Sequence, residues 1–116
     1  MNDEFLRKWK SQIKRGTLSF IVLQALSQKE LYGYELIENI KTKTAIEIAE
    51  GTLYPLMNRL KKESLLDSKW VEQESGIPRK YYFLTKEGQK MLIKMQAYWE
   101  ELEKSIKSYQ YELPKN

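Results

Sequence analysis

Gly51-Thr-Leu-Tyr-Pro-Leu-Met-Asn-Arg-Leu-Lys-Lys62 is the stretch from which the fold can be worked out. On a helix at about 100° per residue, one face gathers the apolar side chains of Leu53, Leu56, Met57 and Leu60. The opposite face holds small groups at its N-terminal end, an amide and cations further along, and no acid. Such a helix suits a DNA groove, because its N-terminal end can meet bases while its cations meet phosphates. The alternative is an ordinary amphipathic helix with a solvated basic face.

Length and composition predict one globular domain. The chain has 116 residues, of which 41% are hydrophobic and 31% are charged, as in folded proteins rather than disordered ones. No apolar run approaches the roughly 20 residues that span a bilayer. The start Met1–Glu4 is too acidic for a signal peptide. We therefore expect a cytoplasmic protein.

The residue types that are missing exclude several function classes. The chain contains neither cysteine nor histidine, which removes disulfides, thiolate nucleophiles, soft-ligand zinc sites and imidazole acid–base chemistry. Paired carboxylates in an apolar setting are also absent. We expect no enzyme, no metal and no cofactor, and a metal- or redox-sensing role is disfavoured. The net charge of +4 is concentrated in a few basic segments, which is typical of a phosphate-contacting surface.

The N-terminal segment predicts a helix with more apolar surface than one small domain can cover. Phe5, Leu6, Trp9 and Ile13 recur at helical spacing. Gly16 is expected to interrupt this helix before a more buried continuation. We interpret the excess apolar surface as packing against a helix of a second subunit.

A helix-turn-helix is predicted next. Leu31–Lys43 has the apolar stripe of a second helix, and the third begins near residues 49–51. Pro55 must lie close to that start, because deeper in a helix proline costs about 3 kcal/mol. Two short helices with a tight link, the second of them basic, form this motif.

After Ser64 the apolar period changes from about 3.6 to 2, which predicts strands. Leu66–Val71 and Arg79–Leu84 flank a short Gly/Pro turn and form a hairpin directly behind the helix-turn-helix. We interpret this hairpin as a wing. Its cations Arg79 and Lys80 follow the tip, where they can reach a neighbouring groove or its phosphates. The alternative is a plain hairpin with solvent-facing cations.

The C-terminal part predicts a long helix with a heptad seam. Thr85 can cap it, and steps of three and four connect Leu92, Met95, Trp99, Leu102, Ile106 and Tyr109. The seam needs a partner helix, which is either the chain's own N-terminal helix or the same helix of another chain. We expect a homodimer whose interface comprises these residues with Phe5, Leu6 and Trp9, rather than a purely intramolecular seam. The expected division is a DNA-binding domain over residues 1–84 and a dimerisation helix over residues 85–116.

Together these elements predict a mainly α (α+β) fold, a winged helix-turn-helix with N- and C-terminal dimerisation helices. The residues also resemble the PadR family of bacterial transcriptional regulators. The matching segments are Tyr32-Gly-Tyr-Glu-Leu-Ile37, Glu50-Gly-Thr-Leu-Tyr-Pro-Leu56, Arg59-Leu60, Leu65-Leu66, Pro78-Arg-Lys-Tyr-Tyr-Phe-Leu-Thr85 and Glu87-Gly88. They span residues 32–88 in the family's order and spacing. The single C-terminal helix resembles the family's short subgroup.

The resemblance implies a homodimeric repressor on a pseudo-palindromic operator, with recognition helices about 34 Å apart. By the family pattern, the DNA contacts are Gly51, Thr52, Tyr54, Pro55 and Asn58, completed by the wing residues Arg79 and Lys80. The helical wheel adds Lys61 and Lys62 as phosphate contacts. Tyr32 either hydrogen-bonds a phosphate or packs under the wing.

The resemblance also implies a small-molecule effector. Some family members release DNA on binding phenolic acids, and others hold flat aromatic drugs between tryptophans at the dimer interface. Trp99 falls on the seam at a position that resembles the drug-stacking tryptophan, and Trp9 can face it from the first helix. Alternatively, both tryptophans simply pack the dimer.

Two other functions remain open at this stage. A non-catalytic small-molecule binder or adaptor dimer could retain the winged fold, although it would not need the acid-free face of residues 51–62. An RNA-binding role is less well supported, because the aromatic residues do not line an exposed stacking sheet.

Overall fold

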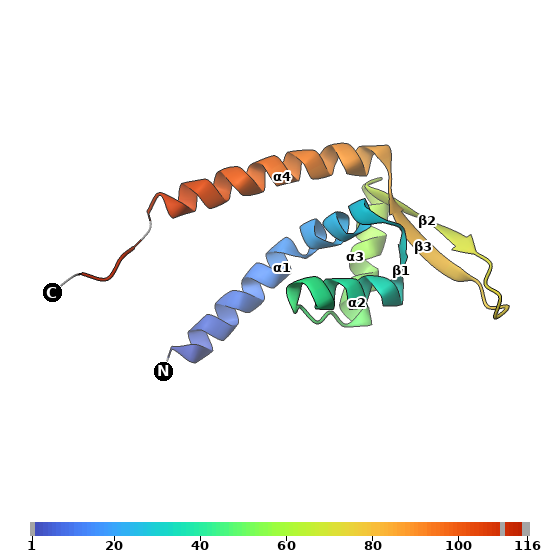
Figure 1. Ribbon diagram of the computed structural model, residues 1–116, viewed down its shortest axis with the longest axis horizontal. Coiled ribbons are helices and arrows are strands. Elements are labelled where there is room, and N and C mark those ends of the chain that lie inside the picture. Colours follow the sequence, from blue (N-terminus) through green and yellow to red (C-terminus); the bar gives the residue numbers. More distant parts are fainter. Residues whose placement is uncertain (1, 110, 115–116) are drawn as a thin grey trace.

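The computed structural model describes residues 2–109 and 111–114, shown as a ribbon in Figure 1. Residues 110, 115 and 116 of the predicted C-terminal segment lie outside the described residues. The elements follow the predicted order, and they are α1 (Asp3–Gln28), β1 (Leu31–Tyr32), α2 (Gly33–Thr44), α3 (Glu50–Lys62), β2 (Leu66–Val71), β3 (Arg79–Leu84) and α4 (Lys86–Lys107). This is the expected winged helix-turn-helix.

Helix α1 runs without a break through Gly16, which corrects the predicted interruption. Glycine costs a helix interior roughly 1 kcal/mol relative to alanine, and this cost does not outweigh good packing of the half that follows it. The C-terminal half of α1 supplies that packing through Val22, Leu23 and Leu26, which are buried in the core.

Helix α2 begins two residues later than the sequence predicts. Leu31 and Tyr32 are instead a short strand, β1, and pair with Tyr82 and Tyr81 of β3. A two-residue strand shows no period, so the sequence pattern could not reveal it. The backbone N–H of Tyr32 donates to the Glu35 carboxylate at 3.2 Å, which satisfies one free amide at the start of α2.

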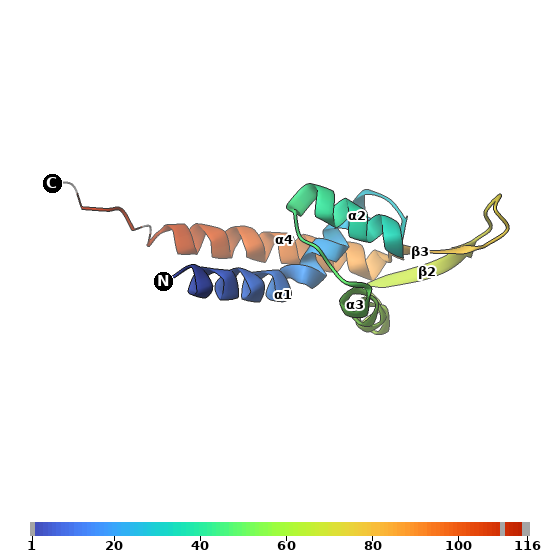
Figure 2. The same ribbon diagram turned by 90° about the horizontal axis from the view of Figure 1, so that it is seen from below.

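Helix α3 has the predicted bounds and the predicted buried face. Leu53, Leu56, Met57 and Leu60 are all 5% exposed or less. Pro55 lies in the second turn, where it removes only the bond to the exposed Gly51 carbonyl. The helix stands upright in Figure 1 and is seen nearly end-on in Figure 2, so it crosses the direction of α1 and α4.

The sheet has the order β1–β3–β2 and is antiparallel throughout. The β2–β3 hairpin extends well beyond the helices at one end of the molecule (Figures 1 and 2). The free ends of α1 and α4 lie at the opposite end of its 68 Å long axis.

Helix α4 is anchored at its start. The backbone N–H of Gly88, in the first turn, donates to the Thr85 hydroxyl at 2.9 Å, so Thr85 caps the helix as the sequence predicts. Gly88 itself lies against the backbone carbonyl of Leu65, and Leu92 belongs to the core. These first turns of α4 belong to the same core as the preceding elements. A domain boundary after Leu84 therefore separates only the later turns of α4.

Candidate DNA interface

The outer face of α3 is open to solvent along its whole length. The exposed residues comprise every position that the sequence predicts as a contact on this helix, which are Gly51, Thr52, Tyr54, Pro55, Asn58, Lys61 and Lys62. Arg59, which is not among the predicted contacts, is exposed beside them. The sequence indicates Arg59 only through its position on the flank of the polar face of this helix. The helix therefore presents an amide and three cations without an intervening acid.

Lys61 is held against the base of the wing. Its amine donates to the Ser68 hydroxyl at 2.9 Å and lies 3.6 Å from the Asp67 carboxylate. Both side chains of the ion pair are about half exposed, so the pair itself adds little stability. The pair instead fixes the position of α3 relative to the wing, because it joins the C-terminal turn of α3 to β2.

Tyr54 contacts other parts of the chain and is not only a candidate DNA contact. Its hydroxyl lies against Gly33, the first residue of α2, and 38% of the side chain is exposed. Burial, and to a lesser extent the neighbouring Tyr54 phenol, raises the pKa of the Tyr82 hydroxyl. Tyr54 thus lies where α3, the start of α2 and the sheet meet.

The two wing cations point to opposite faces of the sheet, because strand side chains alternate. Lys80 lies opposite Trp70 in the register, with its amine 5.9 Å from the centre of the Trp70 ring. Arg79 instead stacks on Tyr32, at 4.6 Å from the ring centre. Tyr32 also makes an edge contact with Tyr81 at 5.5 Å. The structure therefore separates a pair that the sequence placed together, and it places Tyr32 in packing beside the wing.

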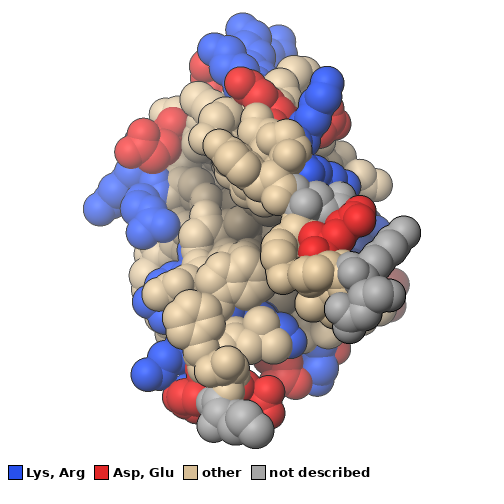
Figure 3. Space-filling model, turned by 90° about the vertical axis from the view of Figure 1, so that its left-hand side faces the viewer, with Lys and Arg blue, Asp and Glu red and all other residues tan. Residues whose placement is uncertain are grey.

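Apolar side chains gather at the end of the molecule opposite the wing. Phe5, Leu6 and Trp9 of α1 are exposed there, as are Trp99 and Ile106 of α4. Figure 3 looks onto this end and shows residues other than Lys, Arg, Asp and Glu filling its centre, around a hollow. A groove of about 640 Å³ between α1 and α4 has an almost wholly apolar lining.

The predicted seam residues do not all share this exposure. Leu92 is buried in the chain's own core, which corrects its assignment to a dimer surface. Met95 is half-buried beside the core, and Leu102 is half-buried in the groove. Tyr109 follows the last residue of α4, Lys107, so the helical seam ends before it.

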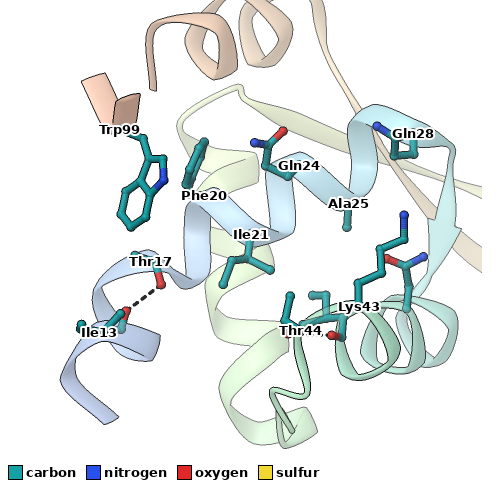
Figure 4. Close-up of a pocket in the computed structure, with 12 residues that line it drawn as sticks. Ile13, Thr17, Phe20, Ile21, Gln24, Ala25, Gln28, Lys43, Thr44 and Trp99 are labelled. Carbon is teal, nitrogen blue, oxygen red and sulfur yellow. Dashed lines mark hydrogen bonds between the residues drawn. The ribbon is translucent and has the colours of Figure 1, made fainter. Parts of the chain in front are cut away.

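Trp99 lines a second cavity, of about 540 Å³, between α1 and α2 (Figure 4). Its ring packs against Phe20, with the ring centres 5.9 Å apart at a tilt of 44°. The far end of this cavity carries Lys43, and the lining contains no acid. Trp9 lines neither cavity, and the ring that packs on Trp99 within the described part of the chain is that of Phe20.

No helix in the described part of the chain combines the length and apolarity needed to cross a membrane.

Comparison with known proteins gives one consistent family. Residues 22–94 match the transcriptional regulator PadR-like family. The crystal structure of a PadR-family transcriptional regulator from Eggerthella lenta has a TM-score of 0.82 and 36% identity, and the match covers 92% of this chain and 93% of that one.

Curated relatives are similar at the same level. An uncharacterised protein of Lysinibacillus sphaericus is 33% identical over 99 residues, which are 84% of this chain and 91% of that protein. The transcriptional regulator YqjI of Escherichia coli is 32% identical over 95 residues, which cover 80% of this chain but only 44% of YqjI.

Proposed function

The chain belongs to the PadR-like family of transcriptional regulators, which bind DNA and are not enzymes, and on this premise we propose that it is a homodimeric repressor. The observation that carries the proposal is the outer face of α3, which is exposed throughout and bears Asn58 and three cations without an acid between them. An adaptor would have no use for such a face. The repressor acts at the nucleoid, in the cytoplasm.

The proposed contacts divide into two kinds. Gly51, Thr52, Tyr54, Pro55 and Asn58 meet base edges and nearby backbone from the major groove. The cations Arg59, Lys61, Lys62, Arg79 and Lys80 meet phosphates and set the position of the protein on the duplex.

The proposed dimer forms through α1 and α4. Phe5 and Ile106 are 72% and 61% exposed in the single chain, which is a costly exposure for large apolar side chains. Their end of the molecule lies opposite the wing, so a second copy there leaves both recognition helices free. Two-fold symmetry would then place the helices in successive major grooves of a pseudo-palindrome.

The proposed effector is a planar aromatic molecule that stacks on Trp99. Trp99 is 40% exposed and lines both the α1–α2 cavity and the α1–α4 groove. A ligand at that point touches α1, which carries the core of the winged domain, and α4, which carries the dimer surface. It can therefore change the spacing of the two recognition helices.

The test is a titration of the purified dimer against the DNA upstream of its own gene, at two salt concentrations. We expect tight binding that excess nonspecific duplex does not displace. Tyr54→Ala and Asn58→Ala should each weaken operator binding while the protein remains dimeric. Lys62→Ala should weaken binding to all sequences alike and lower the salt slope by about one.

Two results would count against the proposal. If the Tyr54→Ala/Asn58→Ala double variant retained operator binding, α3 would not be the helix that contacts the bases. Weak binding to every duplex, abolished by salt, would favour an adaptor or small-molecule binder that keeps the winged fold.

A further inference from the structure

Trp70 is a large aromatic side chain at an exposed position. It is 68% exposed on β2, the outer strand of the wing, in a part of the sheet that no helix covers. Tryptophan buries the largest area of any side chain, and its indole N–H is a hydrogen-bond donor. An exposed tryptophan on a projecting hairpin therefore calls for a binding partner.

The face that carries Trp70 is the face that packs on α3. Side chains at every second position of β2 share a face, so Trp70 lies in line with Ser68 and the buried Leu66. Ser68 accepts the hydrogen bond from Lys61 of α3 at 2.9 Å. Across the strand pair, Lys80 has its amine 5.9 Å from the Trp70 ring and 5.7 Å from the Tyr82 ring.

This arrangement makes one continuous surface from the recognition helix to the wing. It starts at Lys61 of α3, passes Ser68 and reaches Trp70 and Lys80, over the buried ring of Tyr82. Within the paired strands, this face of the sheet carries no acid. It is thus suited to an anionic partner that also offers apolar surface.

The opposite face of the same strands has a different character. Lys69 lies 2.8 Å from the Glu30 carboxylate, and its amine also approaches the Phe83 ring at 5.8 Å. Arg79 stacks on Tyr32. The cations on this face already have partners in the chain, whereas Lys80 contacts only aromatic rings among the described residues.

A second copy of the chain is a poor occupant for this surface. The exposed apolar ends of α1 and α4 lie at the far end of a 68 Å molecule, so a dimer built there leaves the wing uncovered. A duplex held by α3, by contrast, must pass beside the wing. The backbone strand that borders the occupied major groove then lies between the helix and the hairpin.

We propose that Trp70 and Lys80 form a wing contact for the sugar–phosphate backbone that borders the groove occupied by α3. This inference rests on the proposed DNA-binding function. The Lys80 amine pairs with a phosphate, while the Trp70 ring packs on an adjoining deoxyribose with its indole N–H free to donate to a phosphate oxygen. Because backbone is the same in every sequence, the contact adds affinity without base preference.

The first experiment uses tryptophan emission. A duplex from upstream of the gene, and an unrelated duplex at low salt, are titrated into the wild-type protein and into Trp70→Phe. We expect both duplexes to change the emission of the wild type and to protect it from quenching by acrylamide, which is uncharged, and we expect both effects to be lost in Trp70→Phe. Since Trp70 is largely exposed, this variant retains the core, which thermal unfolding confirms independently.

The second experiment measures affinity. Trp70→Ala should weaken binding to both duplexes by a similar factor, roughly tenfold, and Trp70→Phe should weaken it less. Lys80→Gln should lower the salt slope by about one. Lys69→Gln is the matched control, since it removes a cation from the opposite face of the same hairpin, and it should leave the slope unchanged.

The outcomes separate the inference from the function on which it rests. Tight DNA binding by the wild type, with emission and affinity that do not depend on Trp70, would overturn the wing contact alone. A change of oligomeric state in Trp70→Ala would overturn it as well, because Trp70 would then belong to a protein interface. A wild-type protein that binds neither duplex at low salt would remove the DNA-binding function and the wing contact together.

Discussion

The Tyr54 hydroxyl lies against Gly33, in the space that a Cβ atom on Gly33 would fill. Tyr54 belongs to the recognition helix and Gly33 is the first residue of the helix before it, so the glycine sets how closely α3 approaches α2. Tyr32, the next residue towards the N-terminus, supports Arg79 of the wing. The start of α2 therefore fixes the positions of two separate parts of the proposed DNA surface.

Gly33→Ala should shift Tyr54 and weaken operator binding, with a loss of stability of about 1–2 kcal/mol, because the added methyl overlaps a tyrosine ring that can rotate away. The measurement is a double-mutant cycle with Tyr54→Ala. Urea unfolding gives the stability of each variant, and DNA titration gives its affinity. The cost of Gly33→Ala should largely disappear once Tyr54 is alanine. Equal costs in both backgrounds would show that the two residues are not coupled.

Gly88→Ala should destabilise the protein by about 3 kcal/mol, since its methyl would meet the backbone carbonyl of Leu65, which cannot rotate away as a side chain can. Urea unfolding monitored by circular dichroism measures the loss. Gly51→Ala is the control, because nothing lies within 4 Å of the position that its Cβ would take. A Gly88→Ala protein as stable as the Gly51→Ala protein would mean that α4 is not seated as described.

Ile106→Lys should dissociate the proposed dimer without unfolding the winged domain. Ile106 is 61% exposed in the single chain and lines the apolar groove, so a charge there matters only when a partner covers it. Sedimentation velocity gives the oligomeric state, and thermal unfolding reports on the fold. Lys107→Gln serves as the control, since it changes a charge one residue further on whose partner is Glu103 of the same helix. A dimer that survives Ile106→Lys would move the interface elsewhere.

Trp99→Ala should abolish the quenching of tryptophan emission by a planar aromatic compound such as proflavine, because Trp99 lines both cavities and Trp9 lines neither. Trp9→Ala should leave most of that quenching in place. Both variants are first checked for dimerisation by size-exclusion chromatography. If Trp99→Ala yields only monomers, the residue packs the interface instead of binding an effector.

Local sequence patterns predicted most of the fold. The four apolar positions of α3 are the buried ones, the change of period marks β2 and β3, and Thr85 caps α4. The resemblance to the PadR family, based on short segments over residues 32–88, is confirmed by the family match over residues 22–94. These features depend on neighbours within a few positions, so the sequence displays them directly.

The predictions that were wrong concerned features whose outcome depends on distant residues. Gly16 does not break α1, because tertiary packing of the following half outweighs its low helix propensity. Leu31 and Tyr32 form a strand only because β3 lies beside them. Leu92 has the spacing of a seam residue, yet the fold turns it into the chain's own core.

The sequence by itself determined the order and type of the main elements, the apolar and basic faces of α3, and the family. Only the tertiary structure decided that Arg79 and Lys80 serve different faces of the sheet, that Tyr54 rests on Gly33, and that Trp70 lies in line with Lys61 and Lys80. The physical reason is range. Periodicity assigns a side chain to a face of its own element, whereas the neighbour of that face is set by residues far along the chain that only folding brings together.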